Sequence, residues 1–228
     1  MVINMNSNAL MKAGAVAGIF LSIFAVLISD MHTISDLILT LIQNGDNQVI
    51  LPNGIEFPYW VTGVAASPIL VTSIFLFGIG FIGAWKKTGE RMAIISAVVA
   101  FIYATTHIFA ALADIQYAKA VEILQVSGDL SGLAFPGMLR GVSALIIGIT
   151  GGFIMTSCMA IYFHRSKNSI GKAGALLALV AIFIGIFVKT LALWFLPYEM
   201  MVAFLLLMCL KSVGITFMSG ALYQQAVA

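Results

Sequence analysis

Six apolar stretches dominate the sequence, and each is long enough to cross a lipid bilayer as a helix. They cover residues 9–28, 60–85, 92–113, 139–163, 173–196 and 200–223. A hydrocarbon core about 30 Å thick needs roughly 20 apolar residues at about 1.5 Å per residue. Runs of this length without period-2 alternation favour helices over barrel strands, because backbone groups in lipid must bond internally. The sequence predicts an all-α integral membrane protein, a six-transmembrane-helix bundle forming a single membrane domain over residues 1–228.

The composition favours lipid as the main solvent. Hydrophobic residues make up 61% of the chain and charged residues 9%, against roughly 25% charged in an average soluble domain. A net charge of +2 is too small to indicate a nucleic-acid partner. Cys158 and Cys209 lie inside apolar stretches and predict no disulfide. The expected contacts are therefore the bilayer and either protein partners or further copies of the chain.

Charge differs between the two sets of connecting loops. One set holds a single acid, Glu90, together with seven basic residues, which are Lys12, Lys86, Lys87, Arg91, Arg165, Lys167 and Lys172. The opposite loops are mainly acidic. The positive-inside rule predicts a cell-membrane protein with the basic loops and both termini in the cytoplasm. A cleavable signal peptide is the alternative for the first 30 residues, although no small-x-small site precedes Asp30.

Short sequences at the basic flanks recur along the chain. Lys12-Ala13-Gly14-Ala15 returns as Lys172-Ala173-Gly174-Ala175, and Arg91-Met92-Ala93 occupies the comparable place between them. The interval of about 80 residues predicts three helical hairpins related by an axis along the membrane normal. Chance similarity among apolar helices is the alternative.

The outer connections predict an ordered cap. Apolar residues repeat at helical spacing over 34–42 and 117–124. These amphipathic helices either lie on the bilayer or continue the first and third spans, since no Gly or Pro lies between Glu90 and Gly128. Residues 48–57, with Asn53-Gly54 at the turn, predict a small β-hairpin.

Two lysines fall within the predicted spans, where ionisable groups are costly and each is a candidate for function. Lys211 lies near the middle of the stretch 200–223, without a carboxylate at its depth. A polar cavity, a carboxylate of a partner subunit or an anionic ligand is its expected company, and a structural lysine near a helix break is the alternative. Lys189 lies nearer the outer end of its span, where a structural ion pair with an acidic residue is the simpler interpretation.

The most polar helix face belongs to the third stretch. Tyr103, His107 and Asp114 follow each other at i, i+4 and i+11 on one side of a helix. With Asp30 and His32 at the outer end of the first stretch, they predict a small-ligand pocket and are weak candidates for a metal site. No HxxxH or ExxH pair occurs. Hydrogen-bonded structural residues are the alternative, and no cofactor is expected.

Glycine spacing predicts packing rather than chemistry. Gly14-x3-Gly18 and Gly148-x3-Gly152 are typical of closely packed membrane helices. A phosphate loop, a CxxC pair, an HExxH motif and a Ser-His-Asp order are all absent from the sequence, so a hydrolase or redox enzyme has little support.

Three hypotheses for function remain. The leading one is a non-enzymatic subunit, scaffold or assembly factor of a larger membrane complex, whose partner would satisfy Lys211. The alternative is a transporter or channel for a small solute, not coupled through a buried carboxylate. A metal- or cofactor-binding membrane enzyme comes third.

Overall fold

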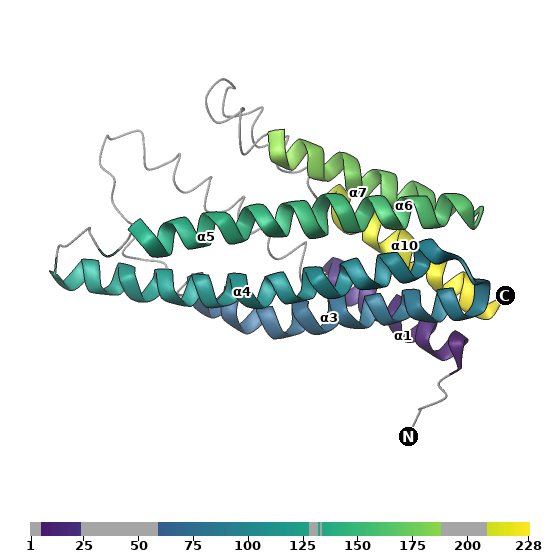
Figure 1. Cartoon of the computed structure of the whole chain (residues 1–228), viewed down its shortest axis with the longest axis horizontal. Helices are drawn as coiled ribbons and strands as arrows, with labels where there is room; N and C mark the ends of the chain where they lie inside the picture. The colour runs from purple at the N-terminus through teal and green to yellow at the C-terminus, as the bar shows by residue number, and fades with distance from the viewer. Residues whose placement is uncertain (1–5, 24–58, 128–131, 133, 188–208) are drawn as a thin grey trace.

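A computed structural model describes residues 6–23, 59–127, 132, 134–187 and 209–228 of the chain (Figure 1). The described residues are 94% helical and contain no strand, so the predicted all-α class holds for this part of the chain. The elements are α1 (Ser7–Phe20), α3 (Tyr59–Thr88), α4 (Arg91–Ser127), α5 (Ala134–Ile147), the π-helical segment η4 (Gly148–Met155), α6 (Thr156–Arg165), α7 (Ser169–Phe187) and α10 (Leu210–Val227).

Three of these helical segments are long and apolar enough to cross a membrane. They are Pro68–Thr88, Arg91–Tyr117 and Leu145–Arg165. Two shorter apolar helices cover Ser7–Ile23 and Ser169–Ile184. The segment Leu145–Arg165 combines parts of three elements, because α5, η4 and α6 follow each other without a break. Together they make one rod beside α4 (Figure 1).

Helix bounds differ from the predicted spans mainly at the ends. The second predicted span, 60–85, corresponds closely to α3. The third, 92–113, lies within α4, which continues to Ser127 through a segment that holds no Gly or Pro, as expected if the predicted helix over 117–124 extends the third span. The fourth begins at Ala134 rather than 139, since Pro136 is tolerated in the first turn of a helix. The predicted helix over 34–42 and the β-hairpin over 48–57 lie outside the described residues.

The described helices pack as a ring in chain order. α1 contacts α3, α3 contacts α4, α4 contacts α5 and α6, α6 contacts α7, and α7 contacts α10. Contacts between α10 and α1 close the ring. Short connections that place sequence neighbours side by side are the common solution for helix bundles. The buried core of the ring takes residues from α1, α3, α4, η4, α6, α7 and α10.

Two glycine pairs bring helices of the ring into backbone contact. A Cβ atom at Gly14 of α1 would lie 2.3 Å from the Cα atom of Gly80 in α3. A Cβ atom at Gly174 of α7 would lie 2.5 Å from the carbonyl oxygen of Gly214 in α10. Only small residues allow such an approach. Gly14 and Gly174 occupy equivalent places in the repeated Lys-Ala-Gly-Ala sequence, so equal contacts are what an internal repeat would produce.

The predicted packing role of the pair Gly148 and Gly152 holds for one member. Gly152 faces Ile182, which a Cβ atom would approach to 3.2 Å. Gly148 faces open space, with nothing within 4 Å of the Cβ position. The close contact falls instead on Gly151, because the π-helical geometry of η4 turns this glycine toward α4.

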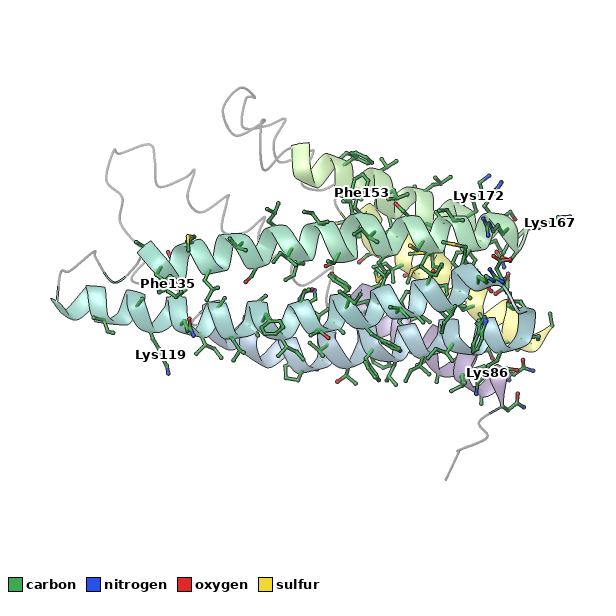
Figure 2. All side chains as sticks on the ribbon, viewed as in Figure 1. Lys86, Lys119, Phe135, Phe153, Lys167 and Lys172 are labelled. Atoms are coloured by element: carbon green, nitrogen blue, oxygen red, sulfur yellow. The ribbon has the colours of Figure 1, made fainter. Side chains whose placement is uncertain are left out.

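Most of the basic side chains gather at one end of the ring, here called the basic end. Lys86, Lys167 and Lys172 lie there, whereas Lys119 and Phe135 lie at the opposite end (Figure 2). The ring interior next to the basic end is filled by an aromatic core of fully buried side chains, which are Phe77, Phe81, Tyr162 and Phe163. Phe81 makes edge-to-face contacts with Tyr162 at 5.5 Å and with Phe163 at 5.9 Å between ring centroids.

Candidate functional site

A layer of hydroxyl residues crosses the ring at one depth. Each member lies fifteen residues from the basic end of its helix, counted from Ser7, Thr88, Arg91, Arg165 and Val227. At about 1.5 Å per residue, the layer is about 22 Å from those termini. Only the described part of α7 carries an apolar residue at this depth, Ile184. We call this set the polar layer, and its members are Ser22, Ser73, Thr106, Thr150 and Ser212.

One side of the polar layer is satisfied by bonds within the chain. The Ser212 hydroxyl of α10 donates to the carbonyl oxygen of Ser22, which lies in the π-helical turn that continues α1. The Ser22 hydroxyl donates to the Ile19 carbonyl oxygen at 2.8 Å. The Thr216 hydroxyl lies 3.0 Å from both the Ser22 hydroxyl and the Ser212 carbonyl oxygen. These bonds fasten α10 to α1 and give this side a structural role.

The opposite side has spare hydrogen-bonding capacity. The hydroxyl oxygens of Thr106 on α4 and Thr150 on η4 lie 3.5 Å apart. Thr106 donates its proton to the Tyr103 carbonyl oxygen and Thr150 donates to the Ile146 carbonyl oxygen, both at 2.7 Å. A hydroxyl has one proton and two lone pairs. The two oxygens therefore face each other as acceptors and suit a shared donor.

His107 lies next to this acceptor pair on α4. Its ring packs against the Tyr103 ring in an edge-to-face contact with centroids 4.6 Å apart. Its Nε2 atom is buried and has no hydrogen-bond partner among the described residues. A buried polar atom without a partner costs about 1–3 kcal/mol, so the imidazole is suited to an additional group.

Tyr103 is positioned by the π-helical segment. Its ring covers Gly151 of η4, where a Cβ atom would lie 1.9 Å from the ring edge. Helices of the π type are rare and often occur at functional sites. Both described π-helical segments, η4 and Leu21–Ile23, contain a member of the polar layer.

Lys211 brings a positive charge to the same region. It is half-buried in the first turn of α10, which begins at Leu210, and its predicted place in the middle of the span 200–223 stays a prediction, because residues 188–208 lie outside the described part of the chain. Among the described side chains the sole carboxylate is Glu90, which bonds Arg165 at 3.1 Å at the basic end. Within the described part, Lys211 thus has no carboxylate partner.

The structure brings together two of the six predicted contact residues, Tyr103 and His107, whose rings pack against each other, and it places Lys211 on α10 at the depth of the polar layer. Asp114 lies two turns beyond His107 on α4, and its side chain is outside the description. Asp30, His32 and Lys189 also lie outside the described residues. No group of three His, Cys, Asp or Glu side chains able to hold a metal occurs among the described residues. The metal candidates therefore stay a prediction.

Sequence reasoning missed Thr150, Ser22 and Ser212. Each is a single hydroxyl residue inside an apolar stretch, and such residues commonly bond their own helix. The sequence does hold a signal for them, because each lies about equally far from the basic end of its own helix. If neighbouring helices run antiparallel, such residues lie at the same depth.

Searches against protein-family models, curated proteins and solved structures find no match to this chain. The site must therefore be interpreted from its own chemistry.

Proposed function

We propose that the chain is a six-span protein of the cell membrane, with the basic end and both termini in the cytoplasm, that binds a small polar solute inside its helix ring and carries it across the bilayer. The observation that carries this proposal is the buried Nε2 atom of His107, which has no hydrogen-bond partner among the described residues, in the helix that also holds the hydroxyl pair of Thr106 with Thr150. Polar groups at membrane depth are expensive, and function is their usual reason.

The aromatic core favours a carrier over an open channel. Fully buried side chains, including Phe77, Phe81 and Tyr162, fill the ring between the polar layer and the basic end. A solute at the polar layer would be blocked from that end, which is the arrangement of one state of an alternating-access cycle.

A subunit of a larger complex is the second candidate, and it rests on the length of α4. Its 37 residues extend about 55 Å at about 1.5 Å per residue, well beyond a hydrocarbon core of about 30 Å. Ile123 on the far part of α4 and Phe135 at the start of α5 are each 64% exposed. Apolar surface beyond the bilayer is suited to a protein partner.

Reconstitution of the purified chain into liposomes tests the carrier proposal. A panel of small labelled solutes should include at least one whose flux exceeds that of empty vesicles. His107→Leu should abolish this flux, whereas the control Thr105→Leu, on an exposed site of the same helix, should retain it. A chain that carries no solute and that always copurifies with one fixed partner from native membranes would instead establish the subunit role.

A further inference from the structure

We infer that a groove between α1 and α3 binds an anionic phospholipid, with the headgroup phosphate at Lys12 and an acyl chain along the groove. This inference goes beyond the carrier proposal. It requires the basic end to lie at one surface of the bilayer, as proposed, but it does not require transport. The cavity itself, the charge at one end of it and its length support the inference.

The groove is a mainly apolar hollow of about 430 Å³ between α1 and α3, which pack side by side (Figure 1). The small side chains of Ala13 and Ala17 line it, next to the place where the backbones of the two helices meet. The larger side chains of Val16, Phe20 and Leu76 also line it and are exposed. A hydrocarbon chain suits such a hollow on the outside of a membrane bundle, because it supplies the van der Waals contacts that an empty hollow lacks.

Lys12 is the charged residue of the groove and lies toward the basic end. Its side chain is exposed, and the sole carboxylate among the described side chains, Glu90, bonds Arg165 instead. Lys86 and Lys87 at the end of α3 add to the positive charge of this region. A phosphate accepts charge-assisted hydrogen bonds from an ammonium group, and basic pockets between membrane helices on the cytoplasmic side suit anionic headgroups. A zwitterionic lipid has no net charge and gains less from this lysine.

The length of the groove fits one leaflet of a bilayer. Lys12 lies five residues from Ser7 at the basic end of α1, and Ser73, which also lines the groove, lies fifteen residues from Thr88 at the basic end of α3. The difference corresponds to about 15 Å at about 1.5 Å per residue, half of a hydrocarbon core of about 30 Å. A phospholipid with its phosphate at Lys12 would place its chain in this leaflet. A helix of a partner protein would cross both leaflets, which is farther than the groove extends.

Native mass spectrometry of the purified chain tests the headgroup, with phosphatidylglycerol and phosphatidylcholine of identical acyl chains supplied in equal amounts. The phosphatidylglycerol adduct should dominate. Lys12→Met should weaken phosphatidylglycerol binding about tenfold, as expected for loss of a charged hydrogen bond, and should remove the preference. The matched control is Lys172→Met, which removes the same charge at the equivalent place of the repeated Lys-Ala-Gly-Ala sequence, on a helix that does not line the groove. It should bind as the wild type does. Equal adducts of the two lipids, or an unchanged preference in Lys12→Met, would overturn the inference.

Ala13→Leu tests the groove without removing a charge. The larger side chain should fill part of the hollow and reduce the phosphatidylglycerol adduct, whereas Ala9→Leu, at an exposed site of α1 outside the groove, should leave it unchanged. Equal binding by these two variants would contradict the inference. So would a wild-type dimer that Ala13→Leu dissociates, because a second copy would then occupy the groove.

Flux in liposomes separates this inference from the carrier proposal. A phosphatidylglycerol preference that depends on Lys12, without flux of any solute, keeps the lipid site and removes the carrier. Flux that depends on His107, without a lipid preference, keeps the carrier and removes the lipid site.

Discussion

Gly151 sets the position of the aromatic ring on which the site depends. The Tyr103 ring occupies the space that a side chain at this position would need, and the same ring packs against His107. One missing methyl group on η4 therefore aligns the imidazole on α4. The π-helical geometry turns Gly151, rather than Gly148, toward α4.

Gly151→Ala should displace the Tyr103 ring, because the new Cβ atom would lie 1.9 Å from it. Overpacking of this kind lowers the free energy of unfolding by about 1–3 kcal/mol. The variant should also lose solute binding. Gly148→Ala is the matched control in the same π-helical segment, with nothing within 4 Å of its Cβ position. Unfolding in denaturant measures both, and equal stabilities of the two variants would contradict the packing described here.

The sequence predicts part of the site, and the part it predicts is local. Tyr103 and His107 were paired from their i, i+4 spacing, which a single helix fixes. Thr150 was missed because its partner Thr106 lies on another element. Residue spacing within one helix carries no information on how two helices are placed beside each other.

At the level of elements, hydropathy locates the helices but not their shape. The span 60–85 nearly matches α3, because its ends are marked by the aromatic pair Tyr59-Trp60 and by Lys86-Lys87. The π-helical segment η4 was not predicted, because an apolar stretch has the same composition whether it forms α-helical or π-helical turns. Its two glycines Gly151 and Gly152 pack against Tyr103 and Ile182 on neighbouring helices.

The glycine pairs predict that α1 and α7 respond alike to substitution. Gly14→Ala and Gly174→Ala each place a Cβ atom against backbone of the neighbouring helix, at 2.3 Å and 2.5 Å. Backbone cannot move aside as a side chain can, so each should destabilise the ring by about 1–3 kcal/mol. Gly220→Ala on α10 faces open space and should cost nothing. If only one of the two glycines is sensitive, as measured by unfolding in detergent, the equivalence of the two hairpins is lost.

A network at the basic end links three helices. The Tyr162 hydroxyl donates to Oε1 of Gln225 at 2.7 Å, and Lys87 donates to the Gln225 backbone oxygen at 2.7 Å. The Gln225 side-chain nitrogen lies 3.3 Å from the Ser166 hydroxyl. The network ties α10 to α3 and α6 directly beneath the aromatic core.

Tyr162→Phe should lower the free energy of unfolding by about 1 kcal/mol, because it removes one hydrogen bond and keeps the ring in place. Glu90→Gln should lower it by less, because its ion pair with Arg165 is open to solvent. The side chain of Glu90 is 30% exposed and that of Arg165 is 55% exposed. Tyr223→Phe, on an exposed site of α10, is the control. Urea unfolding ranks the three, and a larger loss for Glu90→Gln than for Tyr162→Phe would show that the surface pair, not the buried bond, holds this end.

For the whole molecule, polarity changes along the axis of the ring. Charged residues lie at the basic end, an aromatic core follows, and the polar layer lies about 22 Å from the helix termini. While the aromatic core stays packed, it would block a solute that comes from the basic end. A solute would then have to reach the polar layer from the opposite face.

This polarity predicts one-sided access to the polar layer. In a background without Cys158 and Cys209, Thr150→Cys should react with a membrane-impermeant thiol reagent added to the face opposite the basic end. Lys167→Cys, exposed at the basic end, should react only from the other face. Phe81→Cys, in the fully buried aromatic core, should react from neither. Sealed vesicles of known orientation provide the measurement. Labelling of Thr150→Cys from the basic end would mean that the aromatic core does not close the ring, and the protein would then be a channel open to the cytoplasm rather than a carrier.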